Sequence, residues 1–123
     1  MGKVIYKELS YQIIGLAMKL HNKLGSGFLE KVYENSLMVL LEREGLEAKQ
    51  QYPIKVNFSG EIVGDYIADI LVEDKVMVEL KIVDKVTEIH KAQVLNYLKA
   101  TNMKLGIILN FKNKKLEYKR LVL

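Results

Sequence analysis

Three charged residues stand inside stretches of sequence that otherwise predict buried strands. Glu79 and Lys81 lie two positions apart in the segment VMVELKIVDK, and on a strand such residues share one face of the sheet. Asp69 lies ten residues before Glu79, in YIADILV, and is also flanked by apolar residues. Because charged side chains are rarely buried unless they are paired or bind a ligand, these residues are the first candidates for chemistry.

Two carboxylates on neighbouring strands, with a lysine beside them, suit a divalent cation. Mg²⁺ prefers oxygen ligands and is usually held by one or two carboxylates together with water. A lysine nearby could orient or deprotonate a water and stabilise the charge that develops on a phosphorus centre. The alternative is a buried ion pair of Lys81 with Glu79 or Asp69 and no catalysis. Because such pairs stabilise a core less than apolar replacements do, the pattern favours a function.

A shared site also constrains the turn between the two strands. If a two-residue turn paired Glu73 with Val76, Asp69 would oppose Leu80, and Glu79 would face the other side of the sheet. A site made by both carboxylates therefore predicts a turn of odd length or a β-bulge.

A polar stripe on the helix predicted at 85–101 adds further candidates. His90, Gln93 and Tyr97 are spaced by three and four residues, which places them on one helix face. The stripe either lines a cleft above the sheet or is a solvated face whose groups cap nearby backbone. Neither His90 nor His21 has a second histidine at a metal-binding spacing, so a zinc site is not expected.

Two acidic residues near the start of the helix predicted at 28–44 lie one turn apart. Each of Glu30 and Glu34 could be a solvated helix charge. Glu30 would lie in the first turn, where a carboxylate also suits the helix dipole.

The elements that must position these residues follow from the spacing of apolar residues. Helical spacing predicts three helices, at 8–24, 28–44 and 85–101. Alternation and short apolar runs predict five strands, at 48–58, 61–73, 76–83, 105–111 and 116–123. Pro53 indicates an edge strand, and Ser59-Gly60 a tight hairpin turn. The order α-α-β-β-β-α-β-β predicts an α/β fold, a mixed sheet flanked by helices.

Composition bounds the class of protein. With 123 residues, 50% of them hydrophobic, one domain over 1–123 is expected. The chain has no cysteine, which fits a reducing cytoplasm and excludes disulfides and thiolate sites. The N-terminal segment MGKVIYKELSYQ shows no signal-peptide pattern, and no apolar run is long enough to cross a membrane.

The basic charge is concentrated near the C-terminus. The net charge is +4, and six of the 19 basic residues follow Met103, against Glu117 as the only acid there. This segment could attract a polyanion such as DNA. Charge alone favours the other interpretation, a solvated hairpin whose lysines protect an edge strand.

The motifs taken together resemble a known nuclease family. Residues 27–33, GFLEKVY, read G-x-x-E-x-x-Y, and ADILVEDKVMVELK, HKAQVLNYLKATN and GIILNF follow in order. From about His21 to Arg120 the chain resembles the GxxExxY family, a branch of the PD-(D/E)XK nuclease superfamily. The resemblance implies a restriction-endonuclease-like α/β core.

The resemblance also implies a metal site. Asp69 and Glu79 would bind Mg²⁺ or Mn²⁺, Leu80 would lend its backbone carbonyl, and Glu30 would be an extra acid from the helix before the sheet. The superfamily's usual proline before the first acid is replaced here by Ala68.

The other motif residues would act on water and substrate. Lys81 would position the attacking water, and Gln93 and Tyr97, which match a Q-x-x-x-Y pattern, would contact a metal-bound water or the phosphate backbone. The function implied is a metal-dependent nuclease that hydrolyses phosphodiester bonds in DNA. The alternative is a nucleic-acid-binding or protein-interaction module without turnover. A chain this small leaves little surface for sequence-specific readout, so a homodimer or a partner protein is expected.

Overall fold

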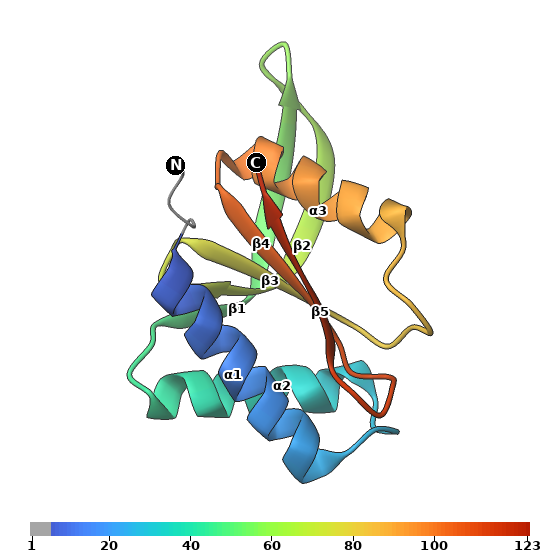
Figure 1. Ribbon diagram of the computed structural model, residues 1–123. Helices are drawn as coiled ribbons and strands as arrows, with labels where there is room; N and C mark the ends of the chain where they lie inside the picture. The colour runs from blue at the N-terminus through green and yellow to red at the C-terminus, as the bar shows by residue number, and fades with distance from the viewer. Residues whose placement is uncertain (1–5) are drawn as a thin grey trace, which may run out of the picture.

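The structure is a computed structural model, and it describes residues 6–123 (Figure 1). Residues 1–5, the start of the segment predicted to carry no signal peptide, lie outside the described residues. In chain order the elements are α1 (Lys7–Leu24), α2 (Glu30–Arg43), β1 (Ala48–Phe58), β2 (Glu61–Val72), β3 (Val76–Lys81), α3 (Glu88–Thr101), β4 (Leu105–Asn110) and β5 (Glu117–Val122). The predicted order is confirmed, and each end agrees with its prediction to within three residues.

The five strands form one mixed sheet in the order β1-β2-β3-β4-β5. The β1–β2, β2–β3 and β4–β5 pairs are antiparallel. The β3–β4 pair is parallel, and α3 makes the crossover between these two strands. Pro53 lies on β1, an edge strand as predicted, and Ser59-Gly60 forms the predicted turn, with φ of 51° and 83°.

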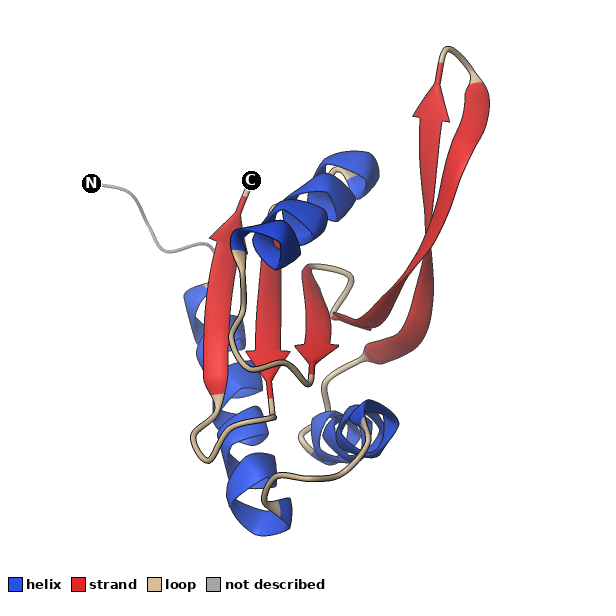
Figure 2. Cartoon of the chain, turned by 90° about the vertical axis from the view of Figure 1, so that its right-hand side faces the viewer, coloured by secondary structure: helices blue, strands red, loops and turns tan. Residues whose placement is uncertain are grey.

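Helices α1 and α2 cover one face of the sheet and α3 covers the other (Figures 1 and 2). On β3, Val78 and Leu80 pack in the core under α1 and α2, whereas Met77 packs in the core under α3. Because side chains alternate along a strand, Glu79 and Lys81 belong with Met77 to the α3 face. The predicted common face of these two residues is therefore present.

The side chains of β1 and β2 switch from one face of the sheet to the other at the point where Gln51 lies opposite Asp69. Between this point and the turn to β3, Ile70 packs under α1 and α2. Between this point and the tip of the β1–β2 hairpin, Ala68 and Ile54 pack under α3. Gln51 has φ 56° and forms no ladder pair, although both of its neighbours do. The outer halves of the two strands consequently leave the sheet as a two-stranded arm, seen at the upper right of Figure 2.

The three helices are short or amphipathic elements of the fold. Within residues 6–123, none has the length and apolar character that a membrane span needs.

Candidate functional site

The turn between β2 and β3 has the odd length that a shared carboxylate site requires. Val72 pairs with Val76, so the turn has three residues, 73–75. The same register places Asp69 opposite Glu79 at the next position beyond the regular ladder. The sequence-based condition on the turn is therefore confirmed.

The two carboxylates meet where β2 separates from β3. Regular pairing between the strands ends at Ile70 and Val78. Beyond it, the Asp69 backbone N–H donates to Glu79 Oε1 at 3.1 Å, and the Leu80 N–H donates to Asp69 Oδ2 at 2.8 Å. Each side chain thus accepts from the backbone of the other strand, which holds both carboxylates at the point of separation.

Burial and mutual repulsion disfavour the ionised forms of the two carboxyl groups at this site. Glu79 is buried, and burial together with the charge of Asp69 raises its pKa to about 8, against opposing effects of the Asp69 N–H and Lys81. Burial also raises the pKa of Asp69, and the charge of Glu34 adds to this effect, while the Leu80 N–H lowers it. A site that disfavours its own ionised carboxylates in this way suits a bound cation.

Lys81 is half-buried beside the carboxylates. In the part of the chain that the structure describes, its ammonium forms no ion pair within 4.0 Å and no hydrogen bond. Its positive charge nevertheless limits the rise in the pKa of Glu79, Asp69 and Glu30. The alternative of a directly bonded Lys81 ion pair is therefore not the arrangement found.

Glu30 begins α2 and faces the same site. Although much of its side chain is exposed, partial burial and the charge of Asp69 raise its pKa. Among residues 6–123, however, no group of three or more His, Cys, Asp or Glu side chains is arranged to hold a metal ion. Glu30 thus does not complete a preformed three-acid site with Asp69 and Glu79. The residues still fit Mg²⁺, which needs only one or two carboxylates with water.

Glu34 is the residue of this region whose importance the sequence did not reveal. It is 2% exposed, so it is not the solvated helix charge that the sequence allowed. Its carboxylate accepts hydrogen bonds from Gln50 and Gln51 and forms an ion pair with Lys31 at 3.0 Å. Gln51 Nε2 donates to Glu34 Oε2 at 3.0 Å. Helix α2 thus supports the kink in β1, the irregular backbone at Gln51 that lies opposite Asp69. The sequence feature that could have pointed to Glu34 is its position one helical turn after Glu30, which places both acids on the same side of α2.

Tyr33 of the segment GFLEKVY has a structural role. The side chain is fully buried, and its ring stacks on Phe111 with centroids 4.6 Å apart. Its hydroxyl donates to the Gly25 carbonyl at 2.6 Å and accepts from the Phe28 N–H at 3.3 Å. These contacts fix the loop before α2 and thereby the position of Glu30.

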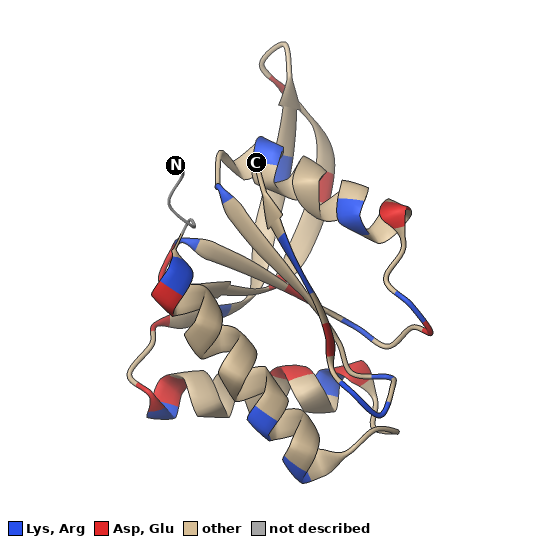
Figure 3. Cartoon of the chain, viewed as in Figure 1, with Lys and Arg blue, Asp and Glu red and all other residues tan. Residues whose placement is uncertain are grey.

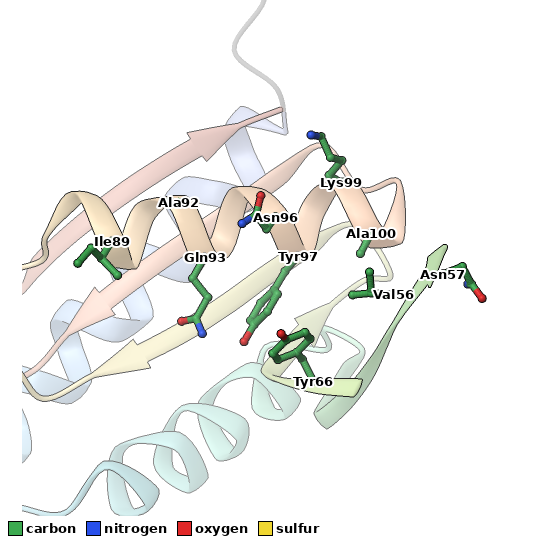
Figure 4. Close-up of a pocket in the computed structure, with 10 residues that line it drawn as sticks. All are labelled: Val56, Asn57, Tyr66, Ile89, Ala92, Gln93, Asn96, Tyr97, Lys99 and Ala100. Carbon is green, nitrogen blue, oxygen red and sulfur yellow. The ribbon is translucent and has the colours of Figure 1, made fainter. Parts of the chain in front are cut away.

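The polar stripe on α3 divides into two parts. His90 caps the helix, because its Nδ1 accepts from the Thr87 N–H at 3.0 Å. Gln93 and Tyr97 instead line an open cleft between α3 and the arm (Figure 4). Tyr97 is 8% exposed, and burial, followed by the charge of Glu79, raises its pKa. Both interpretations of the stripe therefore hold, each for different residues.

Comparison with known proteins identifies the class to which this fold and site belong. The mixed sheet with its α-α-β-β-β-α-β-β order is a restriction-endonuclease-like fold. A family model described as the PD-(D/E)XK nuclease superfamily matches residues 7–121, and the chain belongs to this superfamily.

Solved structures agree on the fold. SSO0001, known from a crystal structure, is similar with a TM-score of 0.54 and 17% identity, over 75% of this chain and 48% of its own. This chain therefore spans about half the length of that neighbour, and the likeness shows the fold alone. No curated protein matches.

Proposed function

We propose that this chain is a divalent-metal-dependent nuclease that hydrolyses phosphodiester bonds in DNA. The observation that carries the proposal is the meeting of the Asp69 and Glu79 carboxylates where β2 separates from β3. Membership of a nuclease superfamily supports it. The chain would form a single cytoplasmic domain over 1–123, and residues 27–33 support its place in the GxxExxY branch.

The proposed metal is Mg²⁺ or Mn²⁺, held by Asp69 and Glu79. The Leu80 N–H points toward β2, and the N–H and C=O of a strand residue lie on the same edge. The Leu80 carbonyl therefore faces the gap in which the carboxylates lie and would be a third oxygen ligand. Glu30 would act through a metal-bound water, consistent with its exposure and with its coupling to Asp69.

Hydrolysis requires a water oxygen to bond to phosphorus while a phosphorus–oxygen ester bond breaks and the departing oxygen takes up a proton. The bound metal would supply Lewis-acid polarisation of the phosphate and acidify a water. Lys81, on the same face as Glu79 and without a partner of its own in residues 6–123, would orient that water and offset charge on the phosphoryl oxygens. Gln93 and Tyr97 would hold the phosphate backbone from α3.

A basic loop lies at the same end of the sheet. Asn110, the last residue of β4, pairs with Lys81, and the loop that follows contains Lys112, Lys114 and Lys115 (Figure 3). Lys112 pairs with Asp84 at 2.6 Å, whereas the other two lysines are exposed. They are available to DNA phosphates. A homodimer or partner protein would extend this small surface.

The test compares cleavage and metal binding. Linear, circular and single-stranded DNA are incubated with Mn²⁺ and the wild type, Asp69→Ala, Lys81→Ala or Asp65→Ala. Asp65, on the same strand as Asp69 but exposed and paired with Lys55, is the matched control. We expect cleavage by the wild type and Asp65→Ala alone.

Equal cleavage by all four proteins would contradict the proposal, because it would show a contaminant or another site. Mn²⁺ binding by calorimetry without any cleavage would instead favour the non-catalytic module.

A further inference from the structure

A cleft of about 720 Å³ lies between α3 and the arm formed by the outer halves of β1 and β2 (Figure 4). Its walls include Val56, Tyr66, Gln93, Asn96, Tyr97 and Lys99. None of the residues that line it is acidic, and Lys99 is basic. The volume falls within the range of about 300–1,000 Å³ that is usual for small-molecule sites. The cleft thus has the size for a ligand of nucleotide dimensions and holds no acid that would repel an anion.

Tyr97 links the cleft to the strands that carry the carboxylates, because it lines the cleft and packs in one buried cluster with Ala68 of β2 and Met77 of β3. Burial raises the pKa of the Tyr97 hydroxyl, and the charges of Glu79 and Asp69 add to this effect. Tyr97 also contacts Tyr66, with ring centroids 5.4 Å apart and planes tilted by 41°. A ligand that lies against Tyr66 is therefore one residue away from the proposed site of cleavage.

Tyr66 is held in place although 46% of it is exposed. Tyr97 supports one side of the ring, and the bare backbone of Gly64 lies beside it. A Cβ at Gly64 would lie 3.1 Å from Tyr66 Cε2 and 3.2 Å from Val56 Cβ. The absence of a side chain at Gly64 thus makes the room that the ring occupies.

We propose that this cleft binds unpaired nucleotides of the DNA strand, with a base stacked on the exposed face of Tyr66. The two tyrosine rings already touch, so a base cannot enter between them and must lie on the outer face. Aromatic side chains stack on any base, since every base has a π-face. Gln93 and Asn96, both exposed in the cleft, offer amide donors and acceptors to base edges, and Lys99 offers its charge to a phosphate.

This chemistry selects single-stranded over duplex DNA. In a duplex both faces of each base are covered by neighbouring base pairs, so stacking on Tyr66 requires a base that has left the helix. The inference rests on the proposed nuclease function, because it names the form of DNA that the same site takes.

The experiment separates binding from cleavage. Fluorescence anisotropy with EDTA present measures binding of a fluorescein-labelled 12-nucleotide single strand and of the same sequence as a duplex. All proteins carry Glu79→Gln, which prevents cleavage and keeps this position neutral at every pH. We expect tighter binding of the single strand, and about tenfold weaker binding of it when Tyr66→Ala is added. Tyr66→Phe should bind as the parent does.

Two further variants guard against indirect effects. Tyr118→Ala removes an exposed tyrosine from β5, outside the cleft, and should leave binding unchanged. Gly64→Ala keeps Tyr66 but displaces its ring, and should weaken single-strand binding as well. Melting temperatures establish that each variant folds. A 2-aminopurine base in the strand should lose fluorescence on binding only when residue 66 is aromatic.

The proposal is overturned if Tyr66→Ala binds the single strand as tightly as its parent does. It is also overturned if the duplex binds equally well, or if neither DNA binds. Cleavage of the same strand by the wild type with Mn²⁺ is scored separately. Tyr66-dependent binding without cleavage would remove the nuclease function and keep the cleft, whereas cleavage without Tyr66-dependent binding would do the reverse.

Discussion

The two halves of strand β3 have different neighbours. From Val76 to Val78 the strand pairs with both β2 and β4, and its side chains are fully buried and apolar. From Glu79 to Lys81 it still pairs with β4, but no ladder pair with β2 remains. The first half is the centre of the core, and the second half is the edge of a gap within the same sheet.

The comparison shows how a fold can place charge next to its core. Where β2 is present, backbone groups satisfy one another and the side chains need only pack. Where β2 has left, the Leu80 N–H needs another acceptor, and Asp69 Oδ2 supplies it at 2.8 Å. The carboxylates therefore complete the hydrogen bonding of the sheet and remain available to a cation.

The largest effect should come from Lys81, in the charged half of β3. Lys81→Met keeps the bulk of the side chain and removes its charge, and residues 6–123 offer it no partner that would be orphaned. We expect a folded protein that binds Mn²⁺ but cleaves DNA at least about 10²-fold more slowly. Calorimetry and cleavage on this variant give both results. Retained cleavage would remove Lys81 from the mechanism, and lost Mn²⁺ binding would make its role structural.

The second prediction concerns pH and the burial of Glu79. Its pKa is about 8 in the folded protein against an ordinary 4.5, so the folded state holds a proton that the unfolded state releases. The stability that this proton contributes is complete below about pH 4.5 and is lost progressively as pH rises from there through 8. Melting temperatures in EDTA should fall from pH 5 to pH 9.

Two controls test the assignment of this pH effect to Glu79. Glu79→Gln cannot ionise and should show a flatter profile, although the raised pKa values of Asp69 and Glu30 leave a remainder of the same sign. Mn²⁺ should raise the melting temperature most at high pH, because it binds the ionised carboxylates. A wild-type profile that rises from pH 5 to pH 9 would contradict the prediction.

The apolar half of the comparison was the easier one to predict from sequence. Alternation and helical spacing depend on local chemistry, and they located all eight elements. The common face of Glu79 and Lys81 follows from strand geometry alone, and the odd turn at 73–75 followed once Asp69 was required to join them. These are short-range consequences of backbone geometry.

The kink and its support could not be predicted in the same way. Gln51 reads as an ordinary residue of an alternating strand, yet it adopts φ 56° and lies opposite Asp69. Its partner Glu34 is 17 residues away on a helix, and only the folded chain shows that this acid is buried. The cleft beside Tyr66 is equally non-local, because it forms between the arm and α3.

A third prediction tests the apolar half through Gly106 on β4. A Cβ at this position would lie 2.5 Å from Val94 Cγ1 on α3, so Gly106→Ala must displace the Val94 side chain or the helix that carries it. We expect a loss of about 1–3 kcal/mol in the free energy of unfolding. Gly15→Ala is the matched control, since nothing lies within 4 Å of its Cβ and helix propensity favours alanine by about 0.5–1 kcal/mol. Denaturant unfolding of both variants should therefore give opposite signs, and equal losses would disprove the close packing.

The smallest effect is expected from Gln51→Gly, at the residue where the arm begins. A residue at φ 56° is strained unless it is glycine, but Gln51 also donates a hydrogen bond to Glu34. In Gln51→Gly the relief of strain and the lost hydrogen bond offset each other, so the free energy of unfolding should change by less than about 1 kcal/mol. Gln51→Val loses the same hydrogen bond and adds a β-branched side chain that resists this φ, so it should cost about 1–3 kcal/mol. If the kink positions Asp69, the valine variant also binds Mn²⁺ more weakly than the glycine variant does. Equal stability and equal Mn²⁺ binding in the two variants would show that the change of face does not depend on the backbone at Gln51.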